Sequence, residues 1–246
     1  MMDINIITPN ILIMKQLINF STPLLNTIKK QIVSLSILDF KLFERKKIVS
    51  VTGSSQSCLS VLALQKAISF VKKVQNKTKV IFLSPVGKKM DFFLLKKIMN
   101  YSSLCLIDSR YEGFDERALI EYSDMALSIG DYVISNGSIA ILVVLDALCR
   151  MIGGIKEENF FQDSFSDGQL DYPCFAKPNS WKKLSIPSIL LSGNSKLIDN
   201  WKNRMKIWKT VLFREDLLFE KKLSKIQLRE IKFLKSILEY ILDKEY

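Results

Sequence analysis

The chain has 246 residues and a formal net charge of +11, and it contains no histidine. Nearly half of its residues are apolar, which excludes a disordered protein, and the length suffices for one large domain or two small ones. The lack of histidine excludes Ser-His-Asp and Cys-His catalysis and histidine-ligated zinc, so any proton transfer falls to Asp, Glu, Lys, Tyr or Cys. The positive charge favours a polyanion such as nucleic acid, or an anionic membrane surface, although many lysines of such a chain are simply solvated.

The cysteines lie far apart and form no Cys-x-x-Cys pair, which predicts reduced, mostly buried thiols in a cytoplasmic protein. They are Cys58, Cys105, Cys149 and Cys174. The amino terminus has Asp3 and Pro9-Asn10 among its apolar residues, which is unlike a signal peptide. The longest apolar run elsewhere, residues 139–145, is too short to span a membrane, so we expect a soluble protein without a membrane partner.

The amino-terminal part begins with a β-like run at residues 4–8, an amphipathic helical pattern at 12–18 and a second β-rich run at 32–38. A basic cluster at 45–47 follows, and then a small, polar stretch at 51–60. Such a stretch can contact a ligand or connect two elements, and its composition favours a connection.

Three short β-rich runs come next, at residues 80–83, 104–107 and 131–134, and helical stretches separate them. The first run stops at Ser84-Pro85, and residues 139–146 after the third run have helical spacing. This alternation predicts an α/β fold with a mainly parallel sheet and helices on its faces. In open sheets of this kind ligands bind at the carboxyl ends of the strands. The stretch 128–137 is the central candidate, because its glycines permit tight turns or the close approach of a ligand.

The chain changes character after Gly153-Gly154, where prolines, Asp, Asn and Ser predict a linker. Helical patterns then return, with a stripe through Trp201, Met205 and Trp208 and a last helix that begins at a capping box of Ser224 and Gln227. We therefore expect a catalytic or binding domain at residues 1–157, a flexible linker at 158–180 and a small all-helical domain at 181–246.

Basic residues are concentrated in the segment 181–214, where Asp199 is the one acidic residue. They are Lys182, Lys183, Lys196, Lys202, Arg204, Lys206, Lys209 and Arg214. A solvated helix face normally mixes both signs, so a face of one sign favours contacts with nucleic-acid phosphates. The Trp and Met stripe is better explained as core than as a platform for stacked bases.

Five motifs occur in a fixed order: FLSPVGKK at 82–89, SRYEGFDER at 109–117, SIGDYVISNG at 128–137, DSFSDG at 163–168 and LLSGN at 190–194. In this order and at these spacings they resemble the bacterial tRNA (guanine-N1)-methyltransferase family, TrmD. That family belongs to the SPOUT class of S-adenosylmethionine-dependent enzymes. The resemblance covers residues 76–220 well and residues 1–50 poorly.

The resemblance implies a SPOUT trefoil knot in the α/β domain, a homodimer with active sites at the subunit interface, tRNA as partner and a magnesium requirement. It implies methyl transfer to N1 of the guanosine immediately 3′ of the anticodon. Three knot loops would hold S-adenosylmethionine, and no protein ligand for a metal is assigned. The cofactor residues implied by position are Phe82, Leu83, Ser84, Pro85, Ser109, Tyr111, Glu112, Gly113, Ser128, Ile129, Gly130, Asp131, Tyr132, Val133, Ile134, Asn136 and Gly137.

The same resemblance implies Asp163 as the catalytic aspartate and Arg150 as the catalytic arginine. N1 of guanine carries a proton and is a poor nucleophile, so a carboxylate has to remove that proton as the methyl group is attacked. A guanidinium can stabilise the negative charge that develops on the guanine oxygen. Taken alone, Arg150 could pair with Asp146 on the same helix, and Asp163 could cap a turn. The five-motif match favours the catalytic roles.

The chain departs from the family pattern in three loops. The family sequence GGGPGM corresponds to TGSSQS at 52–57, and SGGELP corresponds to SNGSIA, where Asn136 replaces a glycine and Ser138 a glutamate. Ser109 replaces the glycine before RYEG. These changes leave open a degenerate, non-catalytic SPOUT protein that binds tRNA. A SPOUT enzyme acting on another RNA is disfavoured by DSFSDG and the carboxyl-terminal helices.

Overall fold

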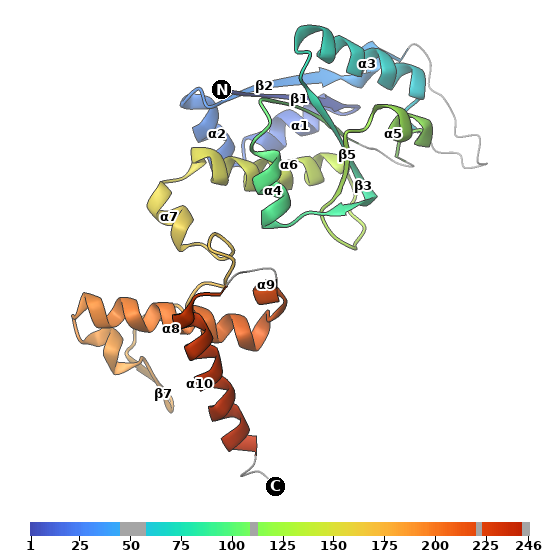
Figure 1. Ribbon diagram of the computed structural model, residues 1–246. Coiled ribbons are helices and arrows are strands. Elements are labelled where there is room, and N and C mark those ends of the chain that lie inside the picture. Colours follow the sequence, from blue (N-terminus) through green and yellow to red (C-terminus); the bar gives the residue numbers. More distant parts are fainter. Residues whose placement is uncertain (45–57, 109–112, 220–222, 243–246) are drawn as a thin grey trace. The chain divides into compact units, whose positions relative to one another are not determined.

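The computed structural model in Figure 1 describes residues 1–44, 58–108, 113–219 and 223–242. The chain divides into two compact units, Met1–Glu157 and Glu158–Tyr246, and each unit is described by itself. Residues 158–180 belong to the second unit. The basic cluster at 45–47 and the loop at 52–57 lie outside the described residues.

A five-stranded sheet forms the centre of the first unit. Its strands are β1 (Met2–Thr8), β2 (Val33–Asp39), β3 (Lys79–Lys89), β4 (Ser103–Ile107) and β5 (Met125–Ser128). They are arranged in the order β2-β1-β4-β3-β5, and every pair of neighbours is parallel. The α/β fold with a mainly parallel sheet, predicted from the alternation of apolar runs, is thereby confirmed.

Helices cover both faces of this sheet (Figure 1). They are α1 (Ile11–Ile18), α2 (Thr22–Lys29), η1 (Phe40–Leu42), α3 (Val61–Val74), α4 (Phe92–Ile98), α5 (Glu116–Tyr122), α6 (Gly137–Cys149) and the π-helical turn η2 (Arg150–Gly154). Each of the six α-helices begins at a polar side chain that accepts a hydrogen bond from a backbone N–H of the first turn, the usual start of a helix. The capping residues are Asn10, Ser21, Ser60, Asp91, Asp115 and Asn136.

Two apolar cores result, because successive side chains of a strand point to opposite faces of the sheet. Ile6 packs in the core under α1, α2, α4 and α6, whereas the next residue, Ile7, packs in the core under α3 and α5. Helix α6 contributes most to the first core through Ile141, Leu145 and Leu148, which are fully buried. Truncating one of these side chains to alanine would cost about 2–5 kcal/mol of folding free energy.

The stretch Gly137–Gly154, which contains α6, is long and apolar enough to cross a membrane, the one such stretch among the residues that the structure describes. Length and composition alone do not separate a spanning helix from a core helix. Helix α6 contacts α1, α2, α4 and β3, and 44% of this stretch is buried.

The prediction of a strand at 131–134 is wrong. Strand β5 ends at Ser128, and residues 129–136 form neither helix nor strand. Gly130, at φ +145°, turns the chain out of the sheet, and Val133 is 100 % exposed. The β-branched composition of this run is typical of a strand, but no neighbouring strand is available for it to pair with beyond Ser128.

The second unit contains mostly helices. Its first helix, α7 (Glu157–Gln162), starts at the last residue of the first unit. The other elements are β6 (Ser180–Trp181), β7 (Leu184–Ser185), η3 (Ser188–Leu191), α8 (Ser195–Phe213), α9 (Asp216–Phe219) and α10 (Lys225–Leu242). The predicted capping box is confirmed: the Ser224 backbone N–H donates to Gln227 Oε1 at 2.9 Å, and the Gln227 N–H donates to Ser224 Oγ at 3.2 Å. The hairpin of β6 and β7 was not expected.

The Trp stripe of α8 packs inside the second unit. The ring of Trp208 lies 6.2 Å from that of Phe233 on α10, and the ring of Trp201 lies 6.2 Å from that of Phe175. Both tryptophans are half-buried. These contacts agree with a core role for the stripe, although Leu212 at its end is exposed.

The four cysteines all lie within the described residues, and none forms a disulfide. Cys105 and Cys149 are buried, Cys58 is half-buried and Cys174 is exposed, so the expectation of mostly buried thiols holds for two of them. Burial raises the pKa of the Cys105 thiol to about 12 and that of Cys149 to about 11. Both thiols therefore remain protonated throughout the neutral pH range.

Iodoacetamide at about pH 8 is expected to alkylate Cys174 first and to leave Cys105 and Cys149 unmodified, because the thiolate is the reactive form. Peptide mass spectrometry of the native and the urea-unfolded protein checks this order. Modification of native Cys105 at the rate of Cys174 would contradict the burial of that thiol.

Candidate active site

Three neighbouring strands of the first unit end at one edge of the sheet. Phe82 of β3 pairs with Ile107 of β4, and Leu83 pairs with Leu127 of β5, so the carboxyl ends of the three parallel strands lie together. The structure thus brings Phe82, Leu83 and Ser128, three of the predicted cofactor residues, to a common edge. Three further predicted residues, Ser109, Tyr111 and Glu112, lie outside the described residues.

The segment that follows Leu83 projects from the sheet. Leu83 and Lys88 both pair with Leu127, so residues 84–87 loop out between them and β3 continues to Lys89. The predicted stop at Ser84-Pro85 is therefore an interruption of a longer strand. A Cβ atom on Gly87 would overlap the backbone of Leu127, so only glycine permits this close return to β5.

The loop at 129–136 is anchored at both ends and exposed between them. The backbone N–H of Gly130 donates to Ser128 Oγ at 3.2 Å, and the Tyr132 hydroxyl donates to the carbonyl of Ile129 at 3.2 Å. Ile129 and Ile134 pack against the first core. The exposed middle of the loop leaves backbone groups accessible beside the strand ends.

The amino terminus of α6 completes this edge. Asn136 Oδ1 accepts a hydrogen bond from the Ser138 N–H at 2.8 Å, and Gly137 starts the helix. The carbonyl of Gly113 accepts a hydrogen bond from the Leu59 N–H at 3.0 Å, and a Cβ atom on Gly113, at φ +92°, would meet no heavy atom within 4 Å. Open backbone and a helix amino terminus suit a ligand that carries both a flat ring and a carboxylate, so these residues fit S-adenosylmethionine.

Asp108 was not recognised from the sequence as part of this edge. Its carboxylate is only 1 % exposed and accepts hydrogen bonds from Thr8 Oγ1 at 2.6 Å and from Ser138 Oγ. Its backbone N–H donates to the carbonyl of Ile7 at 2.9 Å. Asp108 therefore ties the ends of β4 and β1 to the first turn of α6. A small polar residue at the end of each of these elements is the sequence signal that points to it.

The two predicted catalytic residues belong to different units. Arg150 is half-buried and begins η2 directly after α6 in the first unit. Asp163 is half-buried and follows α7 in the second unit, where its backbone carbonyl accepts a hydrogen bond from Ser166 Oγ at 2.8 Å. Asp146, the alternative partner considered for Arg150, accepts a hydrogen bond from Ser21 Oγ at 2.6 Å.

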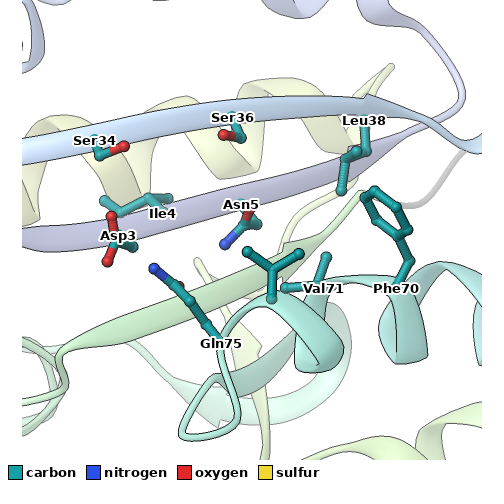
Figure 2. Close-up of a pocket in the computed structure, with 10 residues that line it drawn as sticks. Asp3, Ile4, Asn5, Ser34, Ser36, Leu38, Phe70, Val71 and Gln75 are labelled. Carbon is teal, nitrogen blue, oxygen red and sulfur yellow. The ribbon is translucent and has the colours of Figure 1, made fainter.

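A pocket beside β1, β2 and the end of α3 is separate from the edge at the carboxyl ends of β3, β4 and β5 (Figure 2). Figure 2 shows Asp3 and Asn5 of β1 facing Gln75, with Ser34 and Ser36 on the neighbouring strand. None of the predicted cofactor residues lines it.

No group of three or more Cys, Asp or Glu side chains in the described part of the chain is arranged to hold a metal ion.

Several basic residues expected on the RNA-binding face have acidic neighbours. The ion pairs are Lys202–Asp199 at 3.9 Å, Arg204–Glu230 at 3.0 Å, Lys206–Asp171 at 3.9 Å and Arg214–Asp216 at 2.7 Å. Within the described residues Lys182, Lys183 and Lys196 are exposed and form no ion pair. The basic residues without an acidic partner therefore cover a smaller part of this segment than the sequence alone indicates.

Comparison with known proteins matches residues 2–220 to a family model described as tRNA (Guanine-1)-methyltransferase TrmD. A relative named tRNA (guanine-N(1)-)-methyltransferase from Buchnera aphidicola subsp. Baizongia pistaciae is 35% identical over 209 residues, which cover 81% of this chain and 84% of the relative. One of the same name from Mycoplasma capricolum subsp. capricolum is 34% identical over 215 residues, covering 85% and 88%. Another, from Fusobacterium nucleatum subsp. nucleatum, is 39% identical over 150 residues, covering 61% and 63%.

The match extends almost to the amino terminus, beyond the residues 76–220 on which the resemblance was strongest. Strands β1 and β2 and helices α1 and α2 are therefore part of the shared fold. The chain belongs to the tRNA (guanine-1)-methyltransferase family, TrmD.

Proposed function

We propose that this protein transfers a methyl group from S-adenosylmethionine to N1 of the guanosine immediately 3′ of the anticodon in tRNA. Membership of the TrmD family carries the proposal, since the relatives are named tRNA (guanine-N(1)-)-methyltransferase. The edge formed by β3, β4 and β5 supports the choice of cofactor, because exposed backbone and the amino terminus of α6 meet there.

The cofactor supplies a sulfonium-bound methyl group, which leaves as its carbon–sulfur bond breaks and that electron pair stays on sulfur. The carboxylate of Asp163 accepts the N1 proton of guanine, so that the N1 electron pair forms the new bond to carbon. The guanidinium of Arg150 stabilises negative charge on the guanine oxygen during transfer. No histidine and no covalent enzyme intermediate are needed.

The trefoil knot and the homodimer belong to the same proposal and rest on the family resemblance. Arg150 and the ends of β3, β4 and β5 lie in the first unit, and Asp163 lies in the second. A dimer would build each site where two subunits meet. The exposed lysines at 182, 183 and 196 support tRNA as the partner, since lysine ammonium groups neutralise backbone phosphates.

A protein that keeps this fold and binds tRNA without methylating it is the alternative. The relatives, which are named as methyltransferases, do not favour it, and both Arg150 and Asp163 are present. The altered loops at 52–57 and around Ser138 are the features that motivated it.

Calorimetry with S-adenosylmethionine, followed by a transfer assay with labelled cofactor and unmodified tRNA, tests the proposal. We expect measurable cofactor binding and incorporation of label into the tRNA. Absence of both, with tRNA binding intact, would instead support the non-catalytic protein.

A further inference from the structure

The turn that carries Asp163 closes on itself through several hydrogen bonds. The Phe165 N–H donates to the carbonyl of Gln169 at 2.6 Å, and the Gly168 N–H donates to the carbonyl of Phe165 at 2.9 Å. Gln169 is buried, although it lies in an otherwise polar segment. Residues 163–171 therefore form a defined turn within the second unit.

A single buried hydroxyl fastens this turn to α8. Thr210 Oγ1 accepts a hydrogen bond from the Leu170 N–H at 2.9 Å and donates one to the carbonyl of Lys206 at 2.7 Å. The residue is 0 % exposed. A hydroxyl has one proton to donate. The Thr210 hydroxyl donates that proton to a carbonyl of α8, and its oxygen accepts the hydrogen bond from the turn.

A second contact joins the same two elements. Lys206 Nζ forms an ion pair with Asp171 Oδ1 at 3.9 Å. The backbone N–H of Asp171 donates a hydrogen bond to Ser164 Oγ at 2.9 Å. Ser164 directly follows Asp163 in the chain. The helix that carries Lys202, Lys206 and Lys209 is thus connected, through two neighbouring contacts, to the residues around the proposed base.

We propose that Thr210 is a positioning residue for methyl transfer: its hydroxyl holds the turn that carries Asp163 on α8. This inference rests on the proposed function, in which Asp163 is the general base. A displacement of about 1 Å at a reacting group can cost about 100-fold in rate without weakening substrate binding. We therefore expect loss of the Thr210 hydrogen bond to slow methyl transfer and to leave tRNA binding unchanged.

Thr210→Val keeps the shape of the side chain and removes the hydroxyl, whereas Thr210→Ser keeps the hydroxyl. We expect Thr210→Val to lower kcat by about 10- to 100-fold with KM for tRNA changed by less than about three-fold. We expect Thr210→Ser to restore kcat to within about three-fold of the parent, because the hydroxyl is what holds the turn.

Thr78→Val is the matched control. Thr78 is 3 % exposed, and its hydroxyl donates to the carbonyl of Gln75 at 2.7 Å and forms a hydrogen bond with Ser103 Oγ at 2.8 Å. It lies just before β3 in the first unit, at the end of that strand opposite Leu83. Both valine variants should lose thermal stability, and only Thr210→Val should lose kcat. A parent-like kcat in Thr210→Val, or an equal loss of kcat in Thr78→Val, would overturn the assignment.

Hydrogen exchange provides a readout that needs no activity. In Thr210→Val the amides of residues 163–171 should exchange faster than in the parent, while those of α10 keep their protection. Unchanged exchange at 163–171 would by itself show that the Thr210 hydroxyl does not hold the turn. A parent protein that transfers no methyl group would overturn the proposed function, and the exchange result would still decide whether Thr210 holds the turn.

Discussion

Asp163→Asn is expected to lower the rate of methyl transfer by about 100- to 10,000-fold, the range over which a positioned general base contributes to catalysis. An asparagine side chain has nearly the same shape as aspartate but cannot take up the N1 proton of guanine. The hydrogen bond from Ser166 reaches the backbone carbonyl of residue 163, which the variant retains. Folding and tRNA binding should therefore persist, and single-turnover transfer with saturating tRNA measures the effect.

Asp167→Asn is the control for this change. Asp167 lies in the same turn, and its Oδ1 accepts a hydrogen bond from the Gln169 N–H at 3.1 Å, which an asparagine oxygen can also accept. This variant makes the same chemical change four residues away and should transfer methyl at a rate within about three-fold of the parent. If Asp163→Asn transfers methyl as fast as the parent, Asp163 is not the base.

Asp108→Ala is expected to lower the free energy of unfolding by about 2–5 kcal/mol, because hydrogen bonds to a buried charged group are lost and their donors lose an acceptor. The carboxylate accepts from Thr8 and Ser138, which belong to elements far apart in the sequence. A loss of this size is a large part of the total stability of a typical domain. The midpoint and slope of urea unfolding measure it.

Asp91→Ala is the comparison for Asp108. Asp91 caps α4 from an exposed position, its Oδ1 accepting from the Leu94 N–H at 2.7 Å, and removal of such a cap typically costs about 1 kcal/mol. An Asp108→Ala variant no less stable than Asp91→Ala would show that the buried carboxylate does not hold the edge together. We also expect weaker binding of S-adenosylmethionine to Asp108→Ala, since the first turn of α6 loses its attachment.

The sheet was predictable where the signal was local. The runs that became β1, β2 and β4 alternate or are continuously apolar, and Ser224 with Gln227 marks the start of α10 through contacts within one turn. The run at 131–134 is also rich in β-formers but has no partner strand in the structure. The availability of a partner depends on distant segments, so a local sequence pattern cannot predict it. The loop at 84–87 depends likewise on the close approach of Gly87 to Leu127, a contact between distant segments.

The common edge at the carboxyl ends of β3, β4 and β5 was predictable for a different reason. Parallel strands that alternate with helices must end on the same edge, so the order of the elements was sufficient to bring Leu83 and Ser128 together. The contact of Asp108 with Ser138 was not predictable, because the two residues are separated by α5 and β5. Ser138 was interpreted as a lost glutamate, whereas in the structure its hydroxyl donates to a carboxylate on the neighbouring element.

Mapping the methylated nucleotide tests the central claim most directly. Unmodified tRNA is incubated with the protein and isotopically labelled S-adenosylmethionine, digested, and analysed by mass spectrometry of the fragments. The account predicts labelled 1-methylguanosine at the position immediately 3′ of the anticodon. Label at another nucleotide, at another atom of that guanine, or nowhere in the tRNA would contradict it.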